Sequence, residues 1–305
     1  MLKTTITSLV ILLLAVTTSV QAIKPDRTYR FYPEKLGLIY RDLDVVTPDD
    51  LKIKTWFYPA QDSLPETEME KYWENPVRRP YAVLDDHKRP TIIICNGDAG
   101  NMSWQQYSHA MAFTSRGYNV VTFDWRGFGE SSEWPMNQDY LVYTELLIDY
   151  HSVIEQVVKQ PEVDPARIAV MGWSTGAYLS MAVASQWPEV KCFIGQALMS
   201  SFKEVFPLIQ NLPKNKGRNL IIPADYPESL NPISLAPTFA PSTFLIVGEN
   251  DERTPVWMSQ AILAKLPGKH ELWIVPDASH GGPDGPTKDF DLYNRKIVDF
   301  LDRNL

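Results

Sequence analysis

Residues 166–176 constrain the fold of this chain more than any other stretch. Residues 168–171 form a short apolar run, typical of a strand that is buried on both faces. Gly172-Trp173-Ser174-Thr175-Gly176 follows and fits G-x-S-x-G, and residues 177–186 continue as a helix of small side chains. A strand, a tight glycine-flanked turn and a helix make up a nucleophile elbow, whose close packing excludes side chains beside the serine. A strand-to-helix turn with a capping serine is the alternative interpretation.

The pattern from residue 91 onward alternates between strands and helices. Strands are expected at 91–95, 118–123, 168–171, 190–198, 243–247 and 270–275, and helices at 103–116, 140–159, 177–186, 256–266 and 289–303. This alternation predicts an α/β fold with a mainly parallel sheet and helices on both faces. Ligands of such sheets bind at the carboxyl ends of the strands. Before this region, residues 38–47 and 51–58 alternate as an antiparallel pair around the turn Pro48-Asp49-Asp50.

The chain has 305 residues, enough for one large domain with a small lid. We expect a single domain at 23–305 with a surface insertion at 60–90, in which a short helix near 66–73 is conceivable. Residues 200–242 contain too many prolines for one long helix and have room for one or two short ones. We expect this stretch to cover the strand ends as a lid, where substrate selectivity would lie.

The first residues resemble an export signal. Lys3 supplies a positive charge, residues 6–16 are mostly apolar, and Val20-Gln21-Ala22 offers a small-x-small cleavage site. These features predict a signal peptide at 1–22 and a periplasmic or secreted protein that begins at Ile23. An uncleaved N-terminal membrane anchor is the alternative, although the apolar run is short for a membrane span.

The two cysteines, Cys95 and Cys192, lie in runs that are expected to be strands. A third strand should separate them by roughly 10 Å, which is beyond bridging distance, so both are interpreted as buried thiols. The net charge of −8 argues against a nucleic-acid partner and is compatible with a neutral or cationic substrate. No H-x-x-x-H or other metal-ligand spacing is present, and no metal or organic cofactor is expected.

A serine nucleophile needs a base, and the base needs an orienting carboxylate. Asp251 is the best candidate acid because it follows the strand at 243–247 by a short turn, with Glu249 and Glu252 as competitors. Asp251 could instead be an acid that stabilises a helix N-terminus. His280 is the candidate base, since it alone among the histidines lies on a loop after a strand end and beside glycines.

Acyl transfer also needs N–H donors for the developing oxyanion. One should be the backbone N–H of Thr175, directly after the nucleophile. The other should come from the glycine-containing loop at 96–101, most plausibly from Asp98.

Five motifs in this order resemble those of the α/β-hydrolase superfamily, in its compact branch of serine esterases, lipases and aminopeptidase-like enzymes with a short lid. They are Asn96-Gly97-Asp98-Ala99-Gly100-Asn101, Asp124-Trp125-Arg126-Gly127-Phe128-Gly129-Glu130-Ser131, Gly172-Trp173-Ser174-Thr175-Gly176, Gly248-Glu249-Asn250-Asp251 and Ser279-His280-Gly281. The resemblance implies an eight-stranded sheet whose second strand is antiparallel, and a triad of Ser174, Asp251 and His280. It also implies a structural role for Asp124, gripping the turn at residues 126–129.

This chain departs from the family at Asn96, where a histidine is usual, and at Asp98, where a neutral residue is common. An anionic side chain beside an oxyanion hole would be harmful, so we expect the Asp98 side chain to turn away and only its N–H to serve.

The leading hypothesis is an exported serine hydrolase that cleaves an ester, amide or thioester through an acyl-enzyme, with esterase favoured. A peptidase of the aminopeptidase type is an alternative, for which Glu204, Asp225 or Glu228 of the lid would bind the substrate amine. A catalytically silent binding protein and a different chemistry on the same triad are further alternatives.

Overall fold

The computed structural model describes residues 22–64, 81–95, 97–104 and 106–305, and an eight-stranded sheet organises them. The sheet has the order β12-β11-β10-β9-β6-β8-β3-β2. Its strands are β2 (Arg41–Asp42), β3 (Thr55–Tyr58), β6 (Arg89–Cys95), β8 (Asn119–Phe123), β9 (Val163–Trp173), β10 (Val190–Gln196), β11 (Ser242–Gly248) and β12 (His270–Val275). β3 runs antiparallel to β2 and β8, and the other neighbouring strands are parallel. The predicted fold class is therefore confirmed, including the antiparallel second strand.

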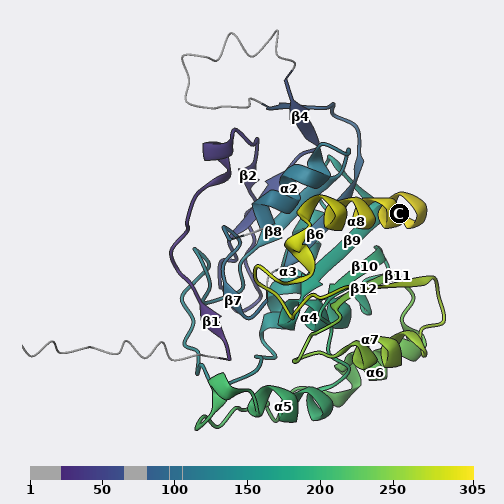
Figure 1. Cartoon of the computed structure of the whole chain (residues 1–305). Helices are drawn as coiled ribbons and strands as arrows, with labels where there is room; N and C mark the ends of the chain where they lie inside the picture. Colours follow the sequence, from purple (N-terminus) through teal and green to yellow (C-terminus); the bar gives the residue numbers. More distant parts are fainter. Residues whose placement is uncertain (1–21, 65–80, 96, 105) are drawn as a thin grey trace, which may run out of the picture.

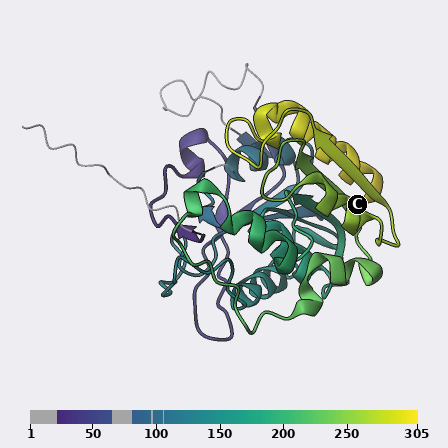
Figure 2. The same ribbon diagram turned by 60° about the horizontal axis from the view of Figure 1, so that its bottom comes forward.

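Helices cover both faces of the sheet (Figures 1 and 2). One face packs against α2 (Gln106–Thr114) and α8 (Phe290–Asn304), and the other against α3 (Leu146–Val157), α4 (Thr175–Ala184) and α7 (Val256–Leu263). Successive residues of a strand alternate between these two cores: Ile93 of β6 lies in one, and Ile92 and Ile94 lie in the other. The middle of the central strands is apolar, as at residues 92–94 of β6 and 168–171 of β9, because both faces are buried there.

Two small sheets lie outside the main one. β1 (Lys24–Pro25) pairs in parallel with β7 (Ala99–Gly100). β4 (Gln61–Ser63) and β5 (Tyr81–Val83) form an antiparallel pair at the two ends of the predicted insertion. The helix considered near residues 66–73 falls outside the described residues.

Several element boundaries differ from those predicted. The helix expected at 140–159 begins at Leu146, because Tyr140 forms an isolated β-bridge with Ile221 and the Leu141 N–H donates to the Ile221 carbonyl at 2.8 Å. β10 ends at Gln196, since Ala197 has a φ of 54° and cannot continue a strand. The hairpin strands expected at 38–47 and 51–58 shorten to β2 and β3.

The stretch between β10 and β11 folds into short helices, as its prolines require. They are α5 (Phe202–Gln210), α6 (Pro232–Leu235) and the 3-10 turns η3 (Pro213–Asn215), η4 (Glu228–Leu230) and η5 (Ala236–Thr238). α5 lies at the bottom of Figure 1, beyond α4. Arg218 joins this stretch to the segment before α3: its guanidinium donates to Asp139 Oδ1 at 3.0 Å and to the Gln138 carbonyl at 2.9 Å.

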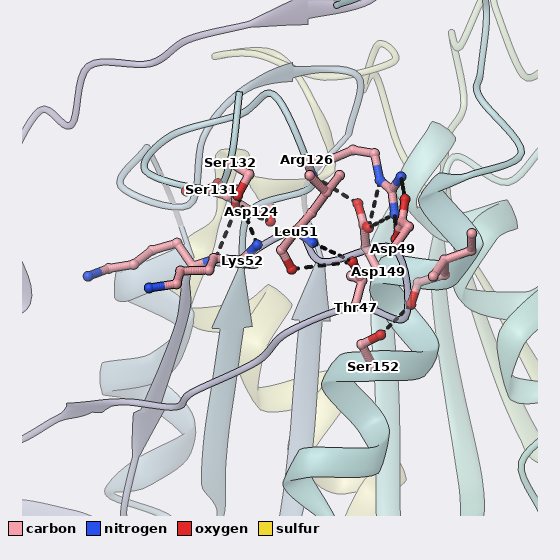
Figure 3. Close-up of polar contacts among 12 residues, drawn as sticks. Thr47, Asp49, Leu51, Lys52, Asp124, Arg126, Ser131, Ser132, Asp149 and Ser152 are labelled. Carbon is pink, nitrogen blue, oxygen red and sulfur yellow. Dashed lines mark hydrogen bonds and ion pairs between the residues drawn. The ribbon is translucent and has the colours of Figure 1, made fainter. Parts of the chain in front are cut away.

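A buried arginine joins the loop after β8 to α3 and to the hairpin turn (Figure 3). Arg126 is fully buried, and its Nε and backbone N–H both donate to Asp149 at 2.8 Å. Its outer nitrogen donates to Asp49 at 2.7 Å. Removing Asp149 would leave a buried cation without its buried partner, a change that is strongly destabilising.

The carboxylate of Asp124 accepts from the Met102 N–H at 2.7 Å and from the Tyr29 hydroxyl at 2.5 Å. It also lies directly against Gly129, where a β-carbon would collide with its Oδ2, and the Asp124 carbonyl accepts from Ser131 Oγ at 2.7 Å. Asp124 therefore packs against the turn after it, while Asp149 holds Arg126.

The two cysteines are both buried and are not joined in a disulfide, as predicted. Cys95 ends β6 and Cys192 lies near the start of β10, with β9 between them. Their separation follows from strand spacing, since β9 places one strand between them.

Candidate active site

Ser174 stands at the turn between β9 and α4 in a strained conformation. Its φ is 52°, and its N–H donates to the Gln196 carbonyl at 2.8 Å. A left-handed φ on a residue other than glycine costs on the order of 1–3 kcal/mol and persists only where the surroundings enforce it. The flanking glycines are part of that enforcement, because a β-carbon on Gly172 would lie 2.4 Å from the Gly176 carbonyl oxygen. The local sequence thus places Ser174 on a tight turn at the end of β9, where it lines the pocket.

The structure brings Ser174, His280 and Asp251 together, although they come from three separate loops. His280 Nε2 lies 3.1 Å from Ser174 Oγ, and His280 Nδ1 lies 2.9 Å from Asp251 Oδ2. A carboxylate only accepts hydrogen bonds, so Nδ1 carries the proton and Nε2 accepts from the serine hydroxyl. Asp251 and His280 are each 4% exposed, which keeps the contact out of bulk water. This arrangement can activate a serine.

Asp251 is held by its own loop. Its Oδ1 accepts from the N–H groups of Arg253 and Thr254, both at 2.9 Å, and its Oδ2 accepts from Thr254 Oγ1 at 2.8 Å. Burial alone would raise the pKa of Asp251, but the hydrogen bonds and charge of His280 and the bonds from Thr254 outweigh it, so that pKa is lowered. Asp251 therefore stays ionised and keeps the imidazole in the required tautomer.

The competing candidates lie apart from Ser174. Glu249 accepts from the Asp277 N–H at 3.0 Å, and Glu252 is exposed. Among the other histidines, His109 bonds Asn294 at 2.8 Å, and its pKa is lowered to about 4 by burial, which a hydrogen bond to Asn294 opposes. His87, His151 and His270 also lie outside the pocket that contains Ser174.

Both predicted oxyanion donors, Asp98 and Thr175, line the same pocket as Ser174 and His280. Thr175 is the first residue of α4, so its N–H has no partner within the helix. Asp98 lies in the loop after β6, and its carbonyl accepts from the Lys24 N–H at 2.7 Å.

Asp98 lines the pocket, and the direction in which its side chain turns stays a prediction. Burial raises the pKa of its carboxyl, and the charges of Arg253, His280 and Lys214 act in the opposite direction. The loop therefore places the carboxyl within the field of the pocket cations. Burial favours the neutral form of this group, which weakens the repulsion that an oxyanion would otherwise meet.

Sequence reasoning missed two residues of this site, Thr254 and Trp173. Thr254 could have been found from its place three residues after Asp251, because an aspartate commonly accepts from the N–H groups that follow it. Trp173 fills the space between the oxyanion loop and the histidine loop. A β-carbon on Gly281 would lie 2.4 Å from its Cζ2, and one on Gly97 would lie 3.3 Å from its carbonyl oxygen. The G-x-S-x-G motif places Trp173 directly before the nucleophile, but it does not predict that the indole packs against the histidine loop.

Within the described residues, no group of three or more His, Cys, Asp or Glu side chains is arranged to hold a metal ion. The pocket opens to solvent, and Phe202, Val205 and Ile209 of the lid line one side of it. A substrate can therefore approach Ser174 between the lid and the strand ends.

The sequence profile of the prolyl oligopeptidase family matches residues 104–305, about two-thirds of the chain. The chain belongs to that family. It is a serine hydrolase with the α/β-hydrolase fold, and its activity is that of an esterase or a peptidase. The resemblance stated from the motifs is thereby confirmed.

Among its relatives is an uncharacterized protein of Mycobacterium tuberculosis strain H37Rv, 27% identical over 244 residues, which make up 80% of this chain and 73% of that protein. The Pyrococcus furiosus esterase Pf2001 superposes with a TM-score of 0.67 at 19% identity, over 92% of this chain and 97% of the esterase. The Pyrococcus horikoshii acylaminoacyl peptidase superposes with a TM-score of 0.65 at 18% identity, over 88% of this chain and 42% of the peptidase. These two structures share the fold with this chain.

Proposed function

We propose that this protein cleaves an ester bond through an acyl-enzyme formed on Ser174. The observation that carries the proposal is the 3.1 Å contact between His280 Nε2 and Ser174 Oγ, with Asp251 2.9 Å from the opposite ring nitrogen. A nucleophile, a base and an orienting carboxylate in hydrogen-bond contact are what acyl transfer requires.

The reaction proceeds in two halves. Ser174 Oγ attacks the substrate carbonyl carbon while His280 Nε2 takes the hydroxyl proton, and the N–H groups of Thr175 and Asp98 stabilise the resulting oxyanion. The intermediate collapses, the leaving alkoxide takes the proton from His280, and the acyl group stays on the serine. Water then attacks the acyl-enzyme with His280 as base, which releases the carboxylic acid and restores Ser174.

One observation favours an ester over a peptide with a free amino terminus. The acidic lid residues considered for amine binding do not line the pocket, and Glu204 accepts from the Ser201 hydroxyl at 3.2 Å.

Labelling with a fluorophosphonate probe tests the mechanism. We expect the wild type to be labelled and Ser174→Ala to remain unlabelled, because only an activated serine reacts with such a probe. A panel of 4-nitrophenyl esters and aminoacyl 4-nitroanilides then distinguishes esterase from peptidase. A folded wild type that resists the probe would favour the silent binding protein.

We also propose that the protein is exported, on the strength of Lys3, the apolar run at 6–16 and the Val20-Gln21-Ala22 site. In the part of the chain that the structure describes, no helix is long and apolar enough to cross a membrane. Mass spectrometry of the N-terminus in cell fractions tests this. A periplasmic or secreted form that begins at Ile23 supports export, whereas an intact chain in the membrane fraction supports the N-terminal anchor.

A further inference from the structure

The pocket that contains Ser174 has an apolar side and a cationic side. The apolar side is formed largely by α5 of the lid and by the start of α4, through Tyr178, Phe202, Val205 and Ile209. The cationic side is formed by Lys214 of η3 and by Arg253 of the loop that carries Asp251. The two cations come from different parts of the chain and face the same hollow.

Arg253 is fixed at the site and has unused donor capacity. Its backbone N–H donates to Asp251 at 2.9 Å, so the residue is tied to the triad loop. Its Nε is shielded from water and has no hydrogen-bond partner among the described residues. The nearest carboxylate, that of Glu252, is 3.7 Å away, beyond hydrogen-bond distance. A buried donor without an acceptor is costly, and a substrate oxygen in the pocket would satisfy it.

Lys214 is the second cation: it is an exposed residue that lines the pocket, and no ion pair or side-chain hydrogen bond joins its ammonium to the described residues. Burial lowers the pKa of Lys214, and the charge of Arg253 lowers it further, whereas Asp98 and Glu252 oppose the shift. The positive charges of Lys214 and Arg253 repel each other, so an anion bound between them would stabilise the charged form of both side chains.

Asp98 is the one carboxylate among the residues that line the pocket. Burial raises the pKa of its carboxyl, just as burial lowers the pKa of Lys214. Among the residues that line the pocket, cations therefore outnumber carboxylates by two to one, which favours a substrate carboxylate over a substrate ammonium. Asp251 and Glu252 beside Arg253, and the net charge of −8, act in the opposite direction.

We infer that Lys214 and Arg253 form a subsite for a second, free carboxylate on the substrate, so that the enzyme prefers half-esters of dicarboxylic acids to neutral esters. Charge-assisted hydrogen bonds from a guanidinium and an ammonium would hold the free carboxylate. The apolar wall of α5 would pack against the chain between the two carboxyl groups. This inference rests on the proposed esterase function.

Three chromogenic esters of similar length test the subsite: mono-4-nitrophenyl adipate, its neutral methyl ester, and the 4-nitrophenyl ester of 4-(trimethylammonio)butanoate. We expect kcat/KM for the adipate half-ester to exceed that for the methyl ester by about tenfold, and the ratio to shrink as salt is added. Because the two adipates differ in one charge, their ratio cancels any general loss of activity in a variant.

The matched variants are Lys214→Met and Lys216→Met, since Lys216 is two residues further along and does not line the pocket. We expect Lys214→Met to remove most of the preference and Lys216→Met to keep the wild-type ratio. Arg253→Met tests the second cation in the same way.

An equal or higher kcat/KM for the methyl ester, or a preference for the cationic ester, would overturn the carboxylate subsite. In both cases fluorophosphonate labelling of Ser174 shows that the serine hydrolase proposal stands. If the wild type hydrolyses none of the esters and is not labelled, the proposed function itself has failed, and the inference falls with it.

Discussion

Replacing Gly281 with alanine should disable the site without touching any member of the proposed triad. A β-carbon at this position would lie 2.4 Å from Trp173 Cζ2, whereas ordinary van der Waals contact begins at 3.4 Å. Either the indole or the histidine loop must therefore move by about 1 Å. Trp173 precedes the nucleophile and Gly281 follows the base, so the shift changes the distance between Ser174 and His280.

The expected loss follows from that displacement. A misplacement of about 1 Å at a reacting centre costs on the order of a hundredfold in rate, equivalent to roughly 2.7 kcal/mol of activation free energy. We expect kcat for a 4-nitrophenyl ester to fall by about this factor, with a smaller change in KM. Gly268→Ala is the matched control, because the nearest atom to its added β-carbon is the Ala240 carbonyl oxygen at 3.7 Å.

A second substitution separates this mechanism from general destabilisation. Trp173→Leu makes room for the added methyl group, so Gly281→Ala should cost less in the Trp173→Leu background than in the wild type. Steady-state kinetics on the four proteins of this cycle measure the coupling. If Gly281→Ala has the kcat of Gly268→Ala, or if the cycle shows no coupling, Trp173 does not set the spacing of the two loops.

Three further outcomes can be checked. Thr254→Val removes the 2.8 Å hydrogen bond to Asp251, and kcat should fall about tenfold; a wild-type rate would mean that the backbone N–H groups suffice. Lys24→Pro removes the N–H that donates to the Asp98 carbonyl, so kcat should fall several-fold, whereas Lys24→Ala, which keeps the donor, should match the wild type. Burial raises the pKa of Asp124 from 3.8 to about 7, although hydrogen bonds from Tyr29 and Met102 oppose the shift. The folded protein therefore binds more protons than the unfolded chain between those values, and stability from Asp124 is lost as pH rises through about 7. Asp124→Asn should remove that loss, by up to about 1.4 kcal/mol per pH unit, as measured by urea unfolding at about pH 5 and about pH 8. An unchanged pH dependence would contradict the raised pKa.

The parts of the fold that could be predicted are those whose conformation is determined by residues close by in the sequence. The apolar run at 168–171 is typical of a strand buried on both faces, and Gly172 is needed because a β-carbon there would collide with the Gly176 carbonyl oxygen. His280 and Asp251 were found because each follows a recognisable strand end by a few residues. Local sequence and global fold agree at these positions.

The parts that could not be predicted depend on partners far away in the chain. The sequence around Tyr140 does not predict that Tyr140 pairs with Ile221. Because of this pairing, α3 begins at Leu146 rather than at residue 140. The electrostatic environment of the Asp98 carboxyl depends on Arg253 and Lys214, which lie more than a hundred residues downstream and act against the effect of burial on its pKa. No motif near Asp98 predicts that these two cations line the same pocket.

The residues that carry out catalysis and the residues that select the substrate come from different kinds of segment. The groups that bring about acyl transfer lie at the strand ends, where short motifs fix them, and the groups that border the substrate come from segments packed against those ends. Phe202 of α5, Lys214 of the lid and Arg253 beside the acid all line one pocket, although no motif links them. A relative with the same five motifs can therefore carry a different charge over the serine. Substrate preference in this family has to be inferred from the residues that surround the triad, and in this chain those residues favour an anion.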